Sequence, residues 1–168
     1  MVICHEITHA FDDKGRKFDS DGNLNDWWKE SDTEKFEQII ATYNEQWGAI
    51  ELEGVKINPG LVMGEALADH GGVNVAIDAL KTLYKEDINK KDENNLTPMH
   101  RFFLSVGRVW ANLRTKEYTK LLTTTDPHPH PMHRVNITLA NTKEFYATYG
   151  IKEDSQFFVP EEKRLTLW

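Results

Sequence analysis

Val2-Ile3-Cys4-His5-Glu6-Ile7-Thr8-His9-Ala10-Phe11 is the stretch that decides the fold, because it contains the pattern H-E-x-x-H in a context that can be helical. One turn of helix separates His5 from His9, so both imidazoles leave the same face and can bind one metal ion. Glu6 lies beside them and can take a proton from a water molecule. Because catalytic zinc takes three protein ligands and keeps one position open, the pattern predicts a zinc hydrolase whose third ligand lies elsewhere in the chain.

The alternative for this stretch is a chance match on an ordinary surface helix. The residues around the motif argue against that alternative, because they are apolar and favour burial of the segment; they are Val2, Ile3, Ile7, Ala10 and Phe11. Buried histidines need a polar partner, so we interpret the motif as a metal site.

A second segment, Gly64-Glu65-Ala66-Leu67-Ala68-Asp69-His70-Gly71-Gly72, offers the third ligand. Glu65 and Asp69 are four residues apart, so one can bind the metal while the other accepts the spare N–H of a ligand histidine. Such a pair on its own is more often part of a solvated face. Here the neighbouring residues are apolar and make a buried pair without a cation unfavourable; they are Leu61, Val62, Met63, Ala66, Leu67 and Ala68.

These two segments resemble the neprilysin family of zinc metallopeptidases, which includes the endothelin-converting enzymes and bacterial oligopeptidase O. The stretch from His5 to Asp13 is similar to the family's zinc helix, and Gly64 to Asp69 is similar to its E-x-x-x-D helix. The resemblance covers nearly the whole chain and continues through Asn25-Asp26-Trp27-Trp28, Val109-Trp110, Asp126-Pro127-His128 and Arg134.

The resemblance implies a set of roles at the metal centre. One zinc ion would be bound by His5, His9 and Glu65. Glu6 would act as the general base. Asp69 would not bind the metal itself but would contact a histidine that does. The implied reaction is the hydrolysis of oligopeptides by a zinc-dependent metalloendopeptidase, so the expected partner is a peptide substrate.

Asp126-Pro127-His128-Pro129-His130-Pro131-Met132-His133-Arg134 is a second stretch with reactive side chains. Its three prolines favour a stiff loop over a helix interior. The family has D-x-H six residues before an Arg, so the resemblance implies that His128 stabilises the oxyanion and that Arg134 binds a substrate carbonyl. Asp126 would then orient His128. The alternative is that His128, His130 and His133 bind a second metal or have no direct role.

The resemblance also implies a pocket for a hydrophobic residue just after the scissile bond. In the family this pocket is lined at the positions of Val109 and Trp110, together with Val2 and Met1. By periodicity alone, Val109 and Trp110 belong to the core face of a helix that begins at Thr97-Pro98. The specificity role therefore depends on the resemblance.

Composition excludes several other classes of protein. With 168 residues, 39% hydrophobic and 28% charged, the chain is long enough for one globular domain with a core. Lys and Arg number 20 and Asp and Glu number 27, which gives a net charge of −7. No basic stripe supports nucleic-acid binding, and no apolar run is long enough for a membrane span. The single Cys4 excludes an internal disulfide, and we expect it to be a small buried residue.

The periodicity predicts a mainly α fold. Helices are expected at about 32–48, after a capping box at Ser31 and Glu34, at 61–84, from 98 onward, and within 135–150. Residues 48–60 allow at most a small hairpin. Gly71-Gly72 permits close approach of another backbone, which we expect to be the zinc helix.

The resemblance implies a zincin-like (gluzincin) helical subdomain. The family places a long segment before the zinc helix, including a strand that pairs with the substrate backbone. We therefore expect residues 1–168 to be the C-terminal part of a neprilysin-like catalytic domain, with weak or no turnover on its own. The alternative is a catalytically impaired zinc-binding or metal-free helical domain that acts as an interaction module, including as a homo-oligomer through exposed apolar surface. Kinship with the bacterial oligopeptidase would favour the cytoplasm, and the terminal Trp168 is expected to be docked.

Overall fold

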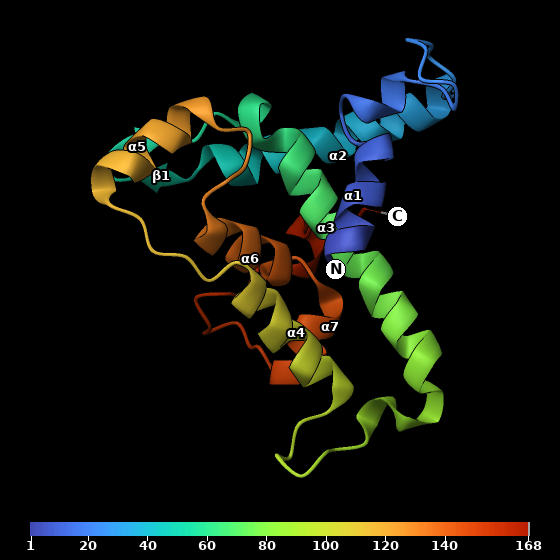
Figure 1. Cartoon of the computed structure of the whole chain (residues 1–168), viewed down its shortest axis with the longest axis vertical. Helices are drawn as coiled ribbons and strands as arrows, with labels where there is room; N and C mark the ends of the chain where they lie inside the picture. Colours follow the sequence, from blue (N-terminus) through green and yellow to red (C-terminus); the bar gives the residue numbers. More distant parts are fainter. Residues whose placement is uncertain (168) are drawn as a thin grey trace.

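The computed structural model describes residues 1–167, and Trp168, which we expected to be docked, lies outside them. Helices follow one another along the chain, with one short hairpin between the second and the third (Figure 1). The elements are α1 (Val2–Thr8), η1 (His9–Phe11), η2 (Gly15–Lys17), α2 (Glu30–Gly48), β1 (Glu51–Leu52), β2 (Val55–Lys56), α3 (Pro59–Tyr84), η3 (Lys85–Asn89), α4 (Pro98–Val109), α5 (Lys116–Thr125), α6 (Pro131–Ala140), α7 (Lys143–Tyr149) and η4 (Glu161–Lys163). The mainly α fold with a small antiparallel hairpin is therefore confirmed.

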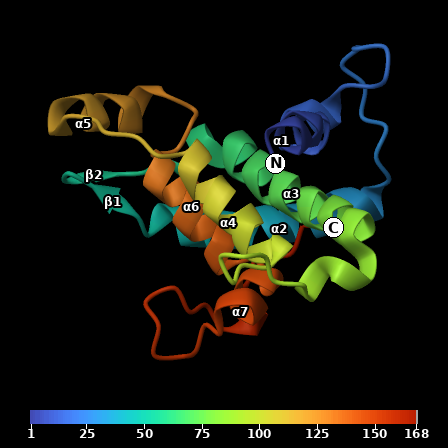
Figure 2. The same cartoon turned by 60° about the horizontal axis from the view of Figure 1, so that its bottom comes forward.

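Helix α3 runs through the centre of the molecule, with other helices against several of its faces (Figure 2). Its N-terminus is fixed by Pro59 in the first turn and by the Asn58 side chain, which accepts a hydrogen bond from the Gly60 N–H. The first half of α3 packs in a core with α2, and its second half packs in a core with α4 and α6. A helix buried on several sides holds its side chains rigidly, which suits a residue that is expected to bind a metal ion.

Helix α1 lies directly on α3 through two glycines. A Cβ atom at Gly72 would lie 2.7 Å from the backbone nitrogen of His5, and one at Gly71 would lie 2.6 Å from the Cγ2 atom of Thr8. No larger residue fits this contact without a shift of the backbone or of Thr8. The expected close approach of the zinc helix at Gly71-Gly72 is therefore confirmed.

The expectation that the apolar residues around the motif are buried was wrong for most of them. His5 and Thr8 are buried against α3, but Ile3 and Ile7 on another face are 77% and 60% exposed. Val2 and Phe11 are also largely exposed, and Cys4 is half-buried. The physical reason is that α1 packs through one face only, and no part of residues 1–167 covers its outer face.

Two helix starts differ from the predicted ones. Helix α2 begins at Glu30 with Lys29 as its N-cap, so Ser31 lies inside the helix and does not cap it. Helix α6 begins at Pro131, because a proline is accepted in the first turn of a helix, where its missing N–H has no partner. Arg134 therefore lies on a helix, and the stiff loop ends before it.

The region from 135 to 150 is helical as predicted but is divided between α6 and α7. Helix α5 was not predicted. Within residues 1–167, no helix has the length and the apolar character to cross a membrane.

Candidate metal centre

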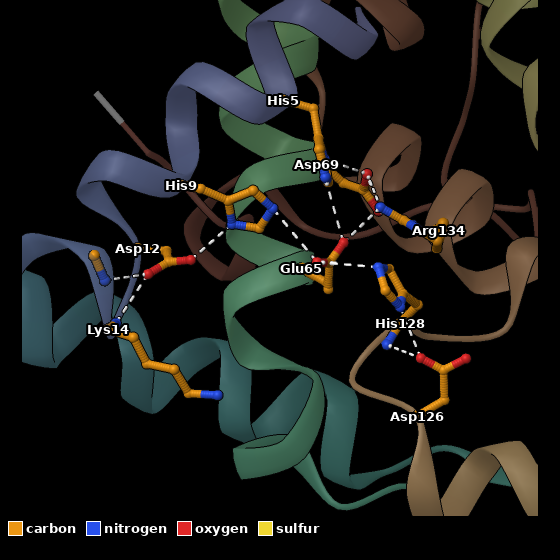
Figure 3. A network of polar contacts seen from close by, with 10 residues as sticks. His5, His9, Asp12, Lys14, Glu65, Asp69, Asp126, His128 and Arg134 are labelled. Atoms are coloured by element: carbon orange, nitrogen blue, oxygen red, sulfur yellow. Dashed lines mark hydrogen bonds and ion pairs between the residues drawn. The ribbon is translucent and has the colours of Figure 1, made fainter.

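Three donor side chains converge where α1 and η1 cross α3 (Figure 3). The Nε2 atom of His5 lies 3.3 Å from one carboxylate oxygen of Glu65, and the Nε2 atom of His9 lies 3.4 Å from the other. The three ligand atoms all lie within 4.8 Å of one another. Donors about 2.1 Å from a tetrahedral zinc ion are roughly 3.4 Å apart, so the donor set and its spacing fit zinc.

The second ring nitrogen of each histidine faces a carboxylate. His5 Nδ1 lies 2.9 Å from Asp69 Oδ1, and His9 Nδ1 is hydrogen-bonded to Asp12 Oδ2 at 2.8 Å. Carboxylates in these positions hold a proton on Nδ1 and leave Nε2 free to bind a metal, which is typical of histidine ligands.

Asp12 is a residue of the candidate site that the sequence did not indicate. It is buried, and its Oδ1 atom accepts hydrogen bonds from the backbone N–H groups of Lys14 and Gly15, at 2.9 and 2.6 Å. These bonds fix the carboxylate that holds His9. The available signal was an acidic residue three positions after His9, followed by the turn residues that satisfy its other oxygen.

Arg134 binds the carboxylates of α3 from the other side. Its Nε and Nη2 atoms donate to the two oxygens of Asp69 at 2.6 and 2.8 Å, and Nη2 also donates to Glu65 at 2.9 Å. The guanidinium carbon lies 3.7 Å from the ring centroid of Trp110, a cation–π contact that the sequence did not indicate. Arg134 and Asp69 are both buried, so this pair balances charge inside the protein.

The surroundings change the pKa values of Glu65 and His5. Burial would raise the pKa of Glu65, but the hydrogen bond from His5 and the charges of Arg134 and His128 lower it overall. Burial would lower the pKa of His5, but the Asp69 and Glu65 carboxylates raise it to about 9. A carboxylate kept ionised suits the binding of a divalent cation, which would displace the extra proton of His5.

His128 reaches the same carboxylate from the loop before α6. Its Nε2 atom lies 3.3 Å from Glu65 Oε1, while its Nδ1 atom contacts Asp126 Oδ1 at 2.7 Å. The His128 backbone N–H also donates to Asp126. Partial burial would raise the pKa of Asp126, but these contacts with His128 lower it. Asp126 is therefore ionised at neutral pH and orients the His128 ring.

A cavity of about 300 Å³ opens beside the three donors. It is lined by Val2, His5, Glu6, His9, Glu65, Trp110, His128 and Arg134. The Glu6 side chain is exposed there. The structure thus brings the expected metal ligands together with Glu6, His128 and Arg134, and with Val2 and Trp110 of the expected hydrophobic pocket. Val109 is 52% exposed and does not border this cavity.

A second metal site does not form at His128, His130 and His133. Within residues 1–167, the one group of three or more metal-binding side chains is His5, His9 and Glu65. His130 instead caps α6 by accepting a hydrogen bond from the Met132 N–H. Burial lowers the pKa of His133 to about 4.

Comparison with known proteins gives relatives over almost the entire chain. The chain is 35% identical to the neutral endopeptidase of Lactococcus lactis subsp. lactis (strain IL1403) over 167 residues, which is 99% of this chain and 25% of that protein. It is 40% identical to endothelin-converting enzyme 1 of Bos taurus over 149 residues, which is 86% of this chain and 20% of that protein.

Solved structures show the same fold. The inhibitor complex of the Mycobacterium tuberculosis zinc metalloprotease ZMP1 has a TM-score of 0.93 at 30% identity, over 99% of this chain and 26% of that one. PepO from Lactobacillus rhamnosis has a TM-score of 0.86 at 30% identity, over 99% of this chain and 25% of that one.

The chain spans about a quarter of the length of these relatives. Residues 1–165 match the model described as Peptidase family M13. The chain therefore belongs to Peptidase family M13.

Proposed function

We propose that this chain binds one zinc ion through His5, His9 and Glu65 and provides the metal centre of a metalloendopeptidase. The observation that carries the proposal is the convergence of these three donors beside a cavity that also contains Glu6. The relatives support it, since two of them are named neutral endopeptidase and zinc metalloprotease.

Each polar residue around the cavity has a distinct task in peptide hydrolysis. Zinc held by His5, His9 and Glu65 would supply a Lewis acid, which makes water more acidic and polarises a carbonyl group. Glu6 takes a proton from the attacking water and passes it to the leaving nitrogen. His128, oriented by Asp126, donates a hydrogen bond to the carbonyl oxygen as negative charge develops there. Asp69 and Asp12 keep the imidazoles of His5 and His9 in the orientation that binds metal.

For Arg134, the geometry favours a task beyond the binding of a substrate carbonyl. Nε and Nη2 already donate to Asp69 and Glu65, which leaves Nη1 for a substrate. Arg134 would therefore hold the ligand carboxylate and bind the substrate at the same time. For the substrate we propose an oligopeptide with a hydrophobic residue after the cleaved bond, because Val2 and the Trp110 ring border the cavity.

The exposed outer face of α1 favours a second candidate function. A helix with Ile3 at 77% and Ile7 at 60% exposure is suited to association with another polypeptide. In this alternative, the chain is a zinc-binding interaction module with weak or no turnover, which associates with itself or with a further part of an M13 catalytic domain.

The experiment measures metal content and cleavage on the same preparations. Elemental analysis should give about one zinc per chain, and a fluorogenic peptide with a hydrophobic residue after the scissile bond should report turnover. Glu65→Gln should lose zinc. Glu6→Gln should keep zinc and lose whatever cleavage the unaltered chain has, while Glu37→Gln on the surface of α2 serves as a matched control.

Retention of zinc by Glu65→Gln at full affinity would overturn the ligand set. Zinc binding with no cleavage would support the interaction module over the complete peptidase. Robust cleavage that depends on Glu6 would support the peptidase and contradict the module.

A further inference from the structure

A second cavity, of about 590 Å³, lies between α4, α6 and α7, which sit side by side in both overall views (Figure 1, Figure 2). Its walls are Phe103, Leu104, Gly107, Arg108, Val135, Asn136, Leu139, Phe145, Tyr149, Ile151 and Phe157. None of these residues lines the cavity beside the metal centre. The apolar cavity is therefore a separate site.

Four of the residues that line the apolar cavity are aromatic, and their rings pack against one another. The centroid of Phe145 lies 5.4 Å from that of Phe103 and 5.1 Å from that of Tyr149, in edge-on and tilted arrangements. Interlocked rings keep such a wall in one shape. A volume between about 300 and 1,000 Å³, with mostly apolar lining and few polar groups, is typical of sites for small molecules.

Two adjacent residues of α4, Gly107 and Arg108, give the apolar cavity open space and a positive charge. Gly107 lies inside the helix, where glycine is unfavourable, and a Cβ atom there would meet nothing within 4 Å. The glycine thus leaves space open toward the cavity. Arg108 is exposed and is the one charged residue of the lining. Its backbone carbonyl accepts a hydrogen bond from the Ala111 N–H, but among residues 1–167 its guanidinium group has no hydrogen bond or ion pair.

We propose that the apolar cavity binds an anionic amphiphile, namely a single-chain carboxylate of the fatty-acid class. Its hydrocarbon chain would lie between the aromatic walls, where each buried methylene contributes through the hydrophobic effect. Its carboxylate would pair with Arg108, which presents two parallel N–H groups to such a head group. A neutral apolar ligand would leave that cation unpaired.

The test uses dodecanoate at concentrations below its micelle threshold, measured by isothermal titration calorimetry on the whole chain. Wild-type protein should bind one equivalent saturably. Gly107→Leu places a side chain in the open space and should weaken binding at least tenfold. Gly107→Ala is the matched control, because it replaces the glycine without filling the cavity and should stay within about threefold of wild type. Equal affinity of the leucine and alanine variants for dodecanoate would show that the ligand does not bind in the apolar cavity.

The head group is tested with Arg108→Gln and a second ligand, dodecanol. The variant should weaken dodecanoate about tenfold and leave dodecanol unchanged, since only the carboxylate pairs with the cation. Equal weakening of both ligands would overturn the role of Arg108. Zinc content should be the same in all variants, which shows that they are folded.

Anionic vesicles distinguish a free fatty acid from a membrane surface. Wild-type protein should not sediment with phosphatidylglycerol vesicles, because the cavity admits one chain and carries one cation. Sedimentation with vesicles, or dimerisation that Gly107→Leu abolishes, in the absence of dodecanoate binding would overturn the proposal.

Discussion

A Cβ atom on Gly72 would lie 2.7 Å from the backbone nitrogen of His5 and 2.8 Å from its Cα atom. The glycine on α3 therefore sets how closely the segment with His5 and His9 approaches the helix that carries Glu65 and Asp69. Every donor distance in the site depends on this contact.

Gly72→Ala should lower both stability and zinc affinity. Because the alanine would meet backbone atoms, α1 must move away from α3, at a cost of about 1–3 kcal/mol in the free energy of unfolding. The movement separates His5 from Glu65, so zinc affinity should fall at least tenfold. Urea denaturation and calorimetric zinc titration measure the two effects. Gly107→Ala is the control and should be stabilised by about 1 kcal/mol; equal behaviour of the two variants would contradict the close contact.

Removing the Asp12 carboxylate should weaken zinc binding without abolishing it. In Asp12→Ala, His9 loses the acceptor that holds its ring, and a loss of about 10- to 100-fold in zinc affinity is expected. Asp21→Asn, in the exposed loop that follows, should bind zinc as wild type does. An unchanged affinity for Asp12→Ala would show that α1 and η1 alone orient His9.

Arg134 and Asp69 should behave as one energetic unit. Arg134→Gln leaves a fully buried carboxylate without its bidentate partner and should cost about 3–5 kcal/mol in metal-free protein. In the double variant with Asp69→Asn, neither residue carries a charge. Its loss in the free energy of unfolding should therefore be clearly smaller than the sum of the losses in the two single variants. Additive losses in urea denaturation would show that the pair is not coupled.

The buried His70 predicts a loss of stability in mild acid. Burial lowers its pKa from 6.5 to about 4, and the Tyr43 hydroxyl is hydrogen-bonded to its Nδ1 atom at 2.7 Å. The unfolded chain therefore takes up a proton that the folded chain does not, and stability falls as pH drops from about 6.5 toward 4. Over this pH range, His70 should lower the free energy of unfolding by about 3 kcal/mol.

The measurement for His70 is the free energy of unfolding at several pH values, for wild type and His70→Gln. The variant should be less stable at pH 7, because it disturbs the bond to Tyr43, but it should lose less stability on acidification. Parallel curves for the two proteins would contradict the assignment.

The sequence predicted those parts of the site that depend on helix geometry alone. His5 and His9, and likewise Glu65 and Asp69, are four residues apart, which places each pair on one helix face whatever surrounds it. Gly71-Gly72 predicted the close contact of α1 with α3 because only glycine leaves room for a second backbone.

The features that the sequence did not predict depend on contacts other than the spacing of residues along one helix. Asp12 lies beyond the end of α1, where the path of a turn sets its direction. Trp110 meets Arg134 only because α4 and α6 are neighbours. The exposure of Ile3 and Ile7 could not be predicted, since an apolar pattern indicates a tendency to be buried and does not provide the surface that buries it.

Glu65 and Asp69 occupy successive turns of a single helix, and this has a consequence for how the site tolerates change. A rotation of α3 about its axis would move the Glu65 carboxylate away from both histidines and would separate Asp69 from His5 and Arg134 at the same time. Core mutations that rotate α3 should therefore weaken zinc binding and loosen the contacts of Arg134 together.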